Sequence, residues 1–167
     1  MATYMGAEFQ QNWDDLFIWE KFFNDHCPRT FIELGTGRGG MSLFTASQCR
    51  SRGIQYHTFD NNTWIDLNGA LASLLNIRGS FHLIDIFSDE GINQIAALID
   101  NSPHPLAMFF DDGNKPREWS IFAPKLSSTG RHLRCSGASD VRKKRTFTHS
   151  ASFYGKFAPE NGLFVAN

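Results

Sequence analysis

A glycine-rich run is the part of this sequence whose residue types and spacing could do chemistry. Gly35, Gly37 and Gly40 satisfy the pattern G-x-G-x-x-G, and Gly39 adds a further glycine. Glycine lets the backbone turn sharply and approach a ligand without a Cβ atom in between, and a helix that follows presents free N–H groups. The run therefore predicts a turn that carries a nucleotide-type cofactor, such as a nicotinamide or flavin dinucleotide, or, in a purely structural alternative, a tight strand-to-helix connection.

Acidic residues follow the glycine run at two places. Asp60 lies 21 residues after Gly39, and a carboxylate there can accept hydrogen bonds from both hydroxyls of a ribose. Asp85 lies in the next apolar run, from which it could reach an adenine amino group or simply form a turn with Ser88. The glycines and these acids together favour a ligand that contains a nucleoside.

The chemistry-bearing residues lie between runs whose hydrophobic patterns alternate between strand and helix. Short apolar runs predict strands at 30–34, 54–59, 80–87 and 105–110. Near-helical spacing predicts helices at 13–23, 41–46, 64–76, 91–99 and from 119 to a point near 127–130. Such alternation implies right-handed crossovers, so we expect an α/β fold, a three-layer Rossmann-like sandwich with a mostly parallel sheet. Ligands of such sheets bind beyond the carboxyl ends of the strands.

The segment Phe31–Ser42 resembles the first motif of class I S-adenosylmethionine-dependent methyltransferases. The informative residue is Glu33, two positions before the first glycine, because dinucleotide dehydrogenases usually carry a small or apolar residue there. The resemblance implies that Glu33 belongs to the network around the methionine end of the cofactor, that Asp60 binds the ribose and that Asp85 lies near the adenine. The cofactor contacts that it implies are Glu33, Gly35, Thr36, Gly37, Gly39, Asp60, Asn61, Asp85 and Asp111.

Two further details are similar to the cephalosporin hydroxylase-like and small-molecule O-methyltransferase branch of that family. They are the glycines after Arg38 and the run Phe109–Gly113, which ends in Asp-Asp-Gly. In a metal-assisted version of this chemistry, Asp111 and Asp112 would supply oxygen ligands to magnesium, which would hold and acidify a substrate hydroxyl. In the alternative, Asp111 closes the cofactor pocket and Asp112 caps the helix that follows.

The candidates for a catalytic residue are Asp111 and Lys115. Asn114 and Lys115 follow the Asp-Asp-Gly run, where the branch has a histidine. Lys115 could act as a base if desolvated, although an exposed lysine stays protonated near neutral pH. The resemblance implies O-methylation of a small-molecule acceptor by S-adenosylmethionine. The alternatives are an NAD(P)-binding oxidoreductase-like domain and a degenerate, non-catalytic methyltransferase fold that binds a partner.

The composition sets the class of protein. The chain has 167 residues, which is about the size of one domain. Of these residues 41% are hydrophobic and 20% charged, a composition too apolar for a disordered chain. No apolar stretch approaches the roughly 18–20 residues that span a bilayer, and residues 1–15 have neither a basic start nor an apolar signal segment. We therefore expect a cytoplasmic protein without a membrane association.

Charge is distributed unevenly along the chain. Residues 1–125 hold 9 Lys and Arg against 15 Asp and Glu, a balance of −6, and residues 126–167 hold 7 against 2, a balance of +5. The basic run 142–145 could meet phosphate or an acidic partner. Because it has no interleaved aromatic residues, a solvated face is favoured and nucleic acid is not expected as a partner.

The alternation of strands and helices fails after residue 130. We therefore divide the single domain into a Rossmann-like part, 1–130, and a basic, irregular segment, 131–167, with 162–166 as the late strand candidate. Residues 131–136 would make a poor buried parallel strand, so either the sheet is truncated there or the reading frame changes near Gly130. Some codons for 129–136, read one base later, encode Gly-Asp-Ile-Cys-Ala-Val; a gene that permits no such shift refutes this explanation. A sheet that is short at one edge favours a homodimer.

Overall fold

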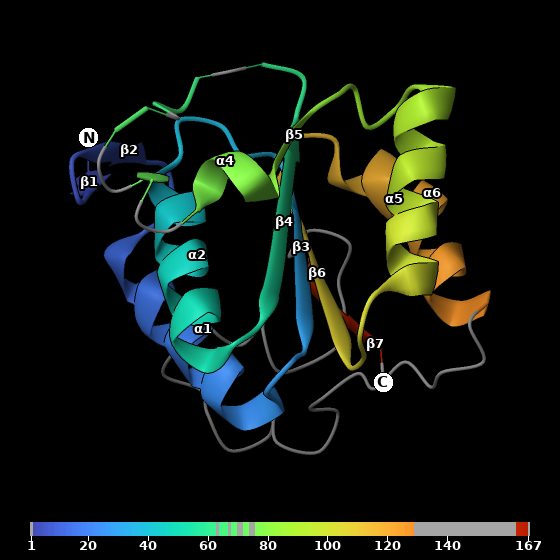
Figure 1. Ribbon diagram of the computed structural model, residues 1–167, viewed down its shortest axis with the longest axis horizontal. Coiled ribbons are helices and arrows are strands. Elements are labelled where there is room, and N and C mark those ends of the chain that lie inside the picture. The colour runs from blue at the N-terminus through green and yellow to red at the C-terminus, as the bar shows by residue number, and fades with distance from the viewer. Residues whose placement is uncertain are drawn as a thin grey trace.

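A four-stranded parallel sheet, extended by one antiparallel strand, forms the centre of the computed structural model (Figure 1). The structure describes residues 2–62, 64–66, 68–69, 72–73, 76–128 and 163–166. The strand order is β5-β4-β3-β6-β7, and β3 pairs in parallel with both β4 and β6. The strands are β3 (Thr30–Leu34), β4 (Gln55–Asp60), β5 (Phe81–Leu83), β6 (Leu106–Phe110) and β7 (Leu163–Ala166).

Helices cover both faces of the sheet (Figure 1). α1 (Trp13–His26) and α2 (Gly40–Arg52) lie on one face, and α5 (Asp89–Asn101) and α6 (Lys115–Ser128) lie on the other. Successive side chains of a strand point to opposite faces, so Phe31 packs with α1 and α2, whereas Ile32 and Leu34 pack with α5 and α6. The three-layer, Rossmann-like α/β sandwich expected from the sequence is confirmed.

Local sequence signals set the ends of the helices. The Asn12 N–H donates to the Asp15 carboxylate at 2.9 Å, which caps the start of α1. Cys27, where α1 ends, adopts a left-handed conformation with φ 43°. The Ser88 hydroxyl accepts the Gly91 N–H at 3.0 Å and starts α5.

A hairpin precedes α1 that the sequence does not predict. β1 (Ala2–Tyr4) and β2 (Ala7–Phe9) pair antiparallel. The two residues between them, Met5 and Gly6, both have positive φ, 51° and 90°. Hairpin turns of this kind are usually marked by Asn or Asp before glycine, and Met5 carries no such signal.

The helix expected at 64–76 is wrong for the described residues 64–66 and 68–69, whereas Ala72 and Ser73 are helical. The Asp66 carboxylate accepts the N–H groups of Asn68 and Gly69 at 2.9 and 3.1 Å, and such local bonds compete with a helix. Residues 63, 67, 70–71 and 74–75 lie outside the described part of the chain. A short helix, α4 (Ile77–Ser80), follows.

The expected strand at 80–87 is shorter in the structure, because β5 ends at Leu83. The exposed Asp85 side chain accepts the Phe87 N–H at 2.8 Å, and the Asp85 carbonyl accepts the Ser88 hydroxyl at 2.7 Å. Asp85 therefore forms the turn with Ser88 that was one of its two predicted roles.

The late strand candidate is confirmed as β7, which pairs antiparallel with β6. Residues 129–162 and 167 lie outside the described part of the chain, and with them the division at 130, the basic run and the frame-change hypothesis. Among the residues that are described, no helix is both long and apolar enough to cross a membrane.

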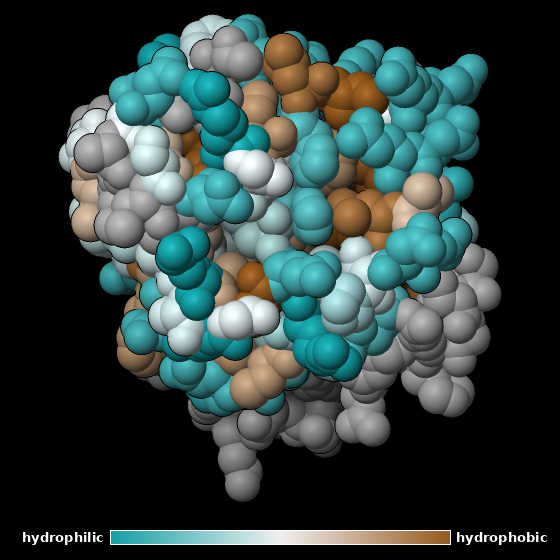
Figure 2. Space-filling view, in the orientation of Figure 1, coloured by the Kyte–Doolittle hydropathy of each residue, from teal (hydrophilic) through white to brown (hydrophobic). Residues whose placement is uncertain are grey.

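Some large apolar side chains are exposed on the surface that the structure describes. Hydrophilic residues cover most of the face seen in Figure 2. The large apolar side chains that are exposed in the described ranges are Met5, Trp13, Phe17, Trp64 and Leu83. Scattered exposed apolar residues are normal for a soluble surface, so the homodimer stays a prediction.

Candidate functional site

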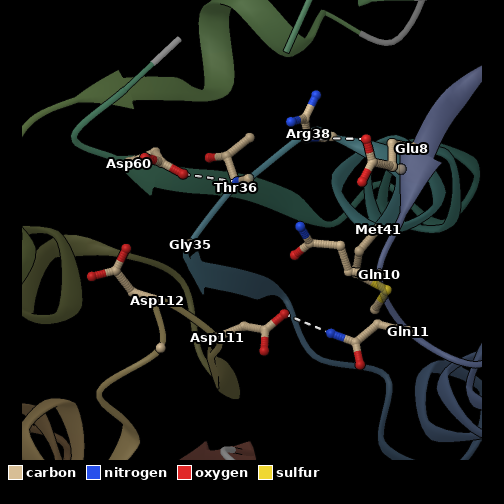
Figure 3. A pocket seen from close by; sticks show the side chains of 14 residues that line it. Glu8, Gln10, Gln11, Gly35, Thr36, Arg38, Met41, Asp60, Asp111 and Asp112 are labelled. Atoms are coloured by element: carbon tan, nitrogen blue, oxygen red, sulfur yellow. Dashed lines mark hydrogen bonds and ion pairs between the residues drawn. The ribbon is translucent and has the colours of Figure 1, made fainter. Parts of the chain in front are cut away.

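A cleft lies at the carboxyl ends of β3, β4 and β6, where the order of the sheet reverses (Figure 3). Its volume is about 270 Å³, just below the roughly 300–1,000 Å³ typical of small-molecule sites. The sequence-predicted residues that line it are Gly35, Thr36, Gly37, Gly39, Asp60, Asp111 and Asp112. The predicted residues that are not part of its lining are Glu33, Asn61, Asp85 and Lys115.

Gly35 is the residue at which the backbone leaves β3 and meets the end of β6. Its φ is 98°, in the left-handed region. A Cβ atom there would lie 2.5 Å from the carbonyl carbon and oxygen of Asp111 and 2.6 Å from the Asp112 nitrogen. These are main-chain atoms that cannot rotate aside, so the position requires glycine. The close approach fixes the floor of the cleft.

Asp60, at the end of β4, is held by the backbone on both sides of its carboxylate. Oδ2 accepts the Gly37 N–H at 2.8 Å and Oδ1 accepts the Asn62 N–H at 2.9 Å. The side chain is buried, with 7% of its surface exposed, yet it lines the cleft. Because a carboxylate has about four acceptor sites, each oxygen can still accept a ligand hydroxyl. Asp60 therefore links the glycine turn to the end of β4, and its contact with a ribose stays a prediction.

Glu33 lies beneath the glycine turn, between β3 and α2, and is fully buried. Its Oε2 accepts the Ser42 hydroxyl at 2.9 Å and the Tyr56 hydroxyl, while Oε1 has no hydrogen-bond partner. Burial raises the pKa of Glu33 to about 7, and the bonds from Tyr56 and Ser42 oppose that shift. Glu33 supports the turn from below, and a direct contact with the cofactor stays a prediction.

Asp111 is held by Gln11, which lies before α1 (Figure 3), and by Lys115, four residues later in the chain. The Gln11 amide donates to Oδ2 at 2.7 Å, and the Lys115 ammonium pairs with Oδ1 at 3.1 Å. Burial raises the pKa of Asp111, and the charge of Lys115 opposes that shift. An ammonium group engaged in this pair has no lone pair with which to take a proton. The geometry therefore gives Lys115 a structural partner, and its role as a base stays a prediction.

Asp112 also faces the cleft (Figure 3). Burial, and after it the charges of three neighbouring aspartates, raise the pKa of Asp112 to about 6. The expectation that Asp112 caps the next helix is wrong. The Arg117 N–H instead lies 2.9 Å from the Asn114 carbonyl and 3.3 Å from its side-chain oxygen, so Asn114 is the cap of α6.

A magnesium site is not assembled by the described residues. No group of three or more His, Cys, Asp or Glu side chains within them converges to hold a metal ion. Both oxygens of Asp111 are already bonded, one to the Gln11 amide and one to the Lys115 ammonium. The role of Asp111 and Asp112 as metal ligands therefore stays a prediction.

Glu118, in the first turn of α6, is a buried carboxyl group that the sequence analysis missed. Neither of its oxygens has a hydrogen-bond partner. Burial first, and then the charges of Asp112 and Asp111, raise the pKa of Glu118 to about 7. In the sequence it is indistinguishable from an ordinary acidic residue near a helix start, where the dipole favours negative charge.

The amino-terminal hairpin supplies part of the cleft that was also missed. A Cβ atom on Gly40 would lie 2.4 Å from the Glu8 carbonyl oxygen, so the hairpin packs directly on the start of α2. The Glu8 carboxylate pairs with Arg38 at 3.0 Å, and the Arg38 guanidinium lies over the Trp64 ring at 5.1 Å. Gly40, which completes the predicted glycine pattern, also lines the cleft. The lining residues that the sequence analysis did not propose as site residues are Glu8, Gln10, Gln11, Arg38, Met41 and Gly113.

The lining of the cleft has more negative than positive groups. It contains four carboxylates and one guanidinium, namely Glu8, Asp60, Asp111, Asp112 and Arg38. Arg38 is paired with Glu8, and Lys115, outside the lining, is paired with Asp111. Asp60 and Asp112 have no cationic counterpart in the lining. A cleft of this charge attracts cations and repels anions.

No family model matches this chain, and no curated protein matches it. Its fold is similar to solved structures of CmcI. One described as Mg-SAM has a TM-score of 0.57 at 13% identity, over 99% of this chain and 76% of that one. One described as SAH has a TM-score of 0.55 at 13% identity, and the match covers 99% of this chain and 82% of that one. An apo-structure of CmcI also has a TM-score of 0.55 at 13% identity, and the match covers 99% of this chain and 76% of that one. At this identity the likeness shows the fold, and the fold expected from the methyltransferase resemblance is confirmed.

Proposed function

We propose that the protein binds S-adenosylmethionine in the cleft and transfers its methyl group to an oxygen of a small molecule. The observation that carries the proposal is a glycine-turn cleft whose carboxylates lack enough cationic partners. S-adenosylmethionine has a sulfonium and an ammonium group, and an acidic lining attracts both. The CmcI structures described as Mg-SAM and SAH have the same fold, which supports the proposal.

The same charge argues against the dinucleotide alternative. A dinucleotide would place a doubly charged pyrophosphate at the glycine turn, within reach of Asp60 and Asp112. Two like charges about 4 Å apart repel by roughly 4 kcal/mol at the effective dielectric of a partly buried site. Arg38, the cation in the lining, is already paired with Glu8. The acidic cleft therefore favours the sulfonium nucleoside.

The residues of the chain bind and align, because methyl transfer needs little else. The cofactor supplies an electrophilic methyl group on a sulfonium, and displacement requires that the acceptor lie in line with it. Asp60 accepts the ribose hydroxyls, and the glycine turn lets the nucleoside lie against the backbone. The carboxylates of Asp111 and Asp112, on the β6 side, face the region left for the amino acid end and the acceptor.

Asp60→Ala tests the ribose contact. Each hydrogen bond from a ribose hydroxyl to a charged acceptor contributes about 1.5–3 kcal/mol, so the loss of two such bonds should weaken the binding of S-adenosylhomocysteine roughly 100-fold or more. Calorimetric titration with S-adenosylmethionine, S-adenosylhomocysteine and reduced dinucleotides measures this. Asp66→Ala is the matched control, because Asp66 bonds its own loop and does not line the cleft. Binding of a dinucleotide with no binding of either sulfur nucleoside would overturn the proposal.

A further inference from the structure

A buried polar network joins three elements beneath the glycine turn. Glu33 on β3, Ser42 on α2 and Tyr56 on β4 are all buried. Both hydroxyl groups donate to one carboxylate oxygen of Glu33, while its other oxygen has no partner. A core position that gathers both donors on one oxygen and leaves the other unsatisfied is costly for packing alone, which points to a further role.

Ser42 connects this network to the turn itself. Its hydroxyl lies 2.9 Å from Glu33 Oε2 and 3.4 Å from the Thr36 carbonyl oxygen. Thr36 lines the cleft, and its carbonyl also accepts the Gly39 N–H at 3.1 Å, which closes the turn. One hydroxyl proton therefore has two acceptors, one in the buried network and one in the wall of the cleft.

We propose that Ser42 and Tyr56 are positioning residues, and that the charge of Glu33 decides which acceptor holds the Ser42 proton. An ionised Glu33 is the stronger acceptor and retains both hydroxyl protons. When Glu33 takes up a proton from solvent, its carboxyl group must itself donate to a hydroxyl oxygen, and Ser42 then donates to the Thr36 carbonyl. The glycine turn is thus held in two different ways, which regulates the cleft; the effect on cofactor binding rests on the proposed function.

The surroundings leave Glu33 as the group of this network that changes charge near neutral pH. The groups that face it are Tyr56 and Thr58 from β4, Ser42 and Cys49 from α2, and Asp111 at the end of β6. Burial raises the pKa of the Tyr56 hydroxyl and of the Cys49 thiol, so both stay neutral. The pKa of Glu33 is raised to about 7, chiefly by burial.

The network can be tested without any ligand. The backbone amide NMR signals of Gly37 and Gly39 should shift with pH in a step centred near 7 in the wild-type protein. The step should vanish in Glu33→Gln and lose at least half of its amplitude in Ser42→Ala. In Tyr56→Phe the midpoint of the step should move to higher pH. The hydrogen bond from Tyr56 stabilises the ionised carboxylate of Glu33, and this variant lacks it.

Two control variants separate this network from its neighbours. Ser47→Ala removes a hydroxyl on the same helix that donates to the Phe44 carbonyl at 2.7 Å, and it should leave the step unchanged. Glu118→Gln removes the other buried glutamate of the site and should also retain the step. A step that survives in Glu33→Gln, or keeps its full amplitude in Ser42→Ala, would overturn the inference.

A second experiment tests whether the network changes the affinity for the cofactor product. The affinity for S-adenosylhomocysteine should change about fivefold between pH 6 and pH 8 in the wild-type protein, and the change should flatten in Ser42→Ala. Affinity that does not depend on pH in the wild type would overturn the inference and leave the proposed function standing. If the nucleoside does not bind at any pH, the proposed function fails, and the ligand-free NMR titration still decides the network.

Discussion

Gly35→Ala is expected to abolish binding of S-adenosylhomocysteine and to lower the free energy of unfolding by about 2–5 kcal/mol. The added methyl group would lie 2.5 Å from main-chain atoms of Asp111, so β3 and β6 must separate where the cleft has its floor. The left-handed φ of 98° adds conformational strain. Urea unfolding followed by circular dichroism measures the stability, and calorimetry measures the binding.

Gly53→Ala is the matched control for Gly35→Ala. Gly53 also has a positive φ, 68°, but no atom lies within 4 Å of an added Cβ. It ends α2, at the opposite end from the glycine turn. Its substitution should cost only the conformational strain, roughly 1–2 kcal/mol, and should leave binding intact. If the two variants lose the same stability and both still bind, the close approach of Gly35 to β6 is not what the cleft depends on.

The parts of the site that sequence alone could predict are those encoded by neighbours in the chain. The glycine turn follows an apolar strand and precedes a helix, and both signals lie within Phe31–Ser42. Asp60 could be placed because parallel strands end at the same edge of the sheet, so the last residue of β4 must lie beside the turn after β3. The Gly37 N–H to Asp60 bond of 2.8 Å is the direct result.

The parts that could not be predicted depend on long-range packing or on competition between local bonds. Gln11 reaches Asp111 across 100 positions, through a segment held by a hairpin whose turn has no sequence signal. Asn114 rather than Asp112 caps α6, because two polar positions separated by one glycine offer the helix alternative starts. Asp85 satisfies its own turn, which ends β5 early.

Glu33→Gln is expected to remove a large part of the pH dependence of folding. The pKa of Glu33 is about 7 in the folded protein, against an ordinary value of 4.5. Between these values the folded protein keeps a proton that the unfolded chain has lost, so the free energy of unfolding falls as the pH rises from 4.5 to 7. The wild-type protein should therefore lose roughly 3 kcal/mol relative to Glu33→Gln across this window. Urea unfolding at half-unit steps of pH measures the difference.

The difference in the free energy of unfolding between the wild type and Glu33→Gln separates the contribution of Glu33 from that of groups with the opposite pH dependence. Burial lowers the pKa of His57 to about 4, so His57, whose Nδ1 lies 3.1 Å from Nε2 of His82, removes stability as the pH falls below 6.5. Both proteins share this loss, and it cancels. Glu20→Gln, at an exposed position of α1, is the control. Its free energy of unfolding should change with pH in parallel with that of the wild type. A constant difference between wild type and Glu33→Gln from pH 4.5 to 8 would show that Glu33 is not held protonated by its burial, and the charge-dependent sharing of the Ser42 proton would fail with it.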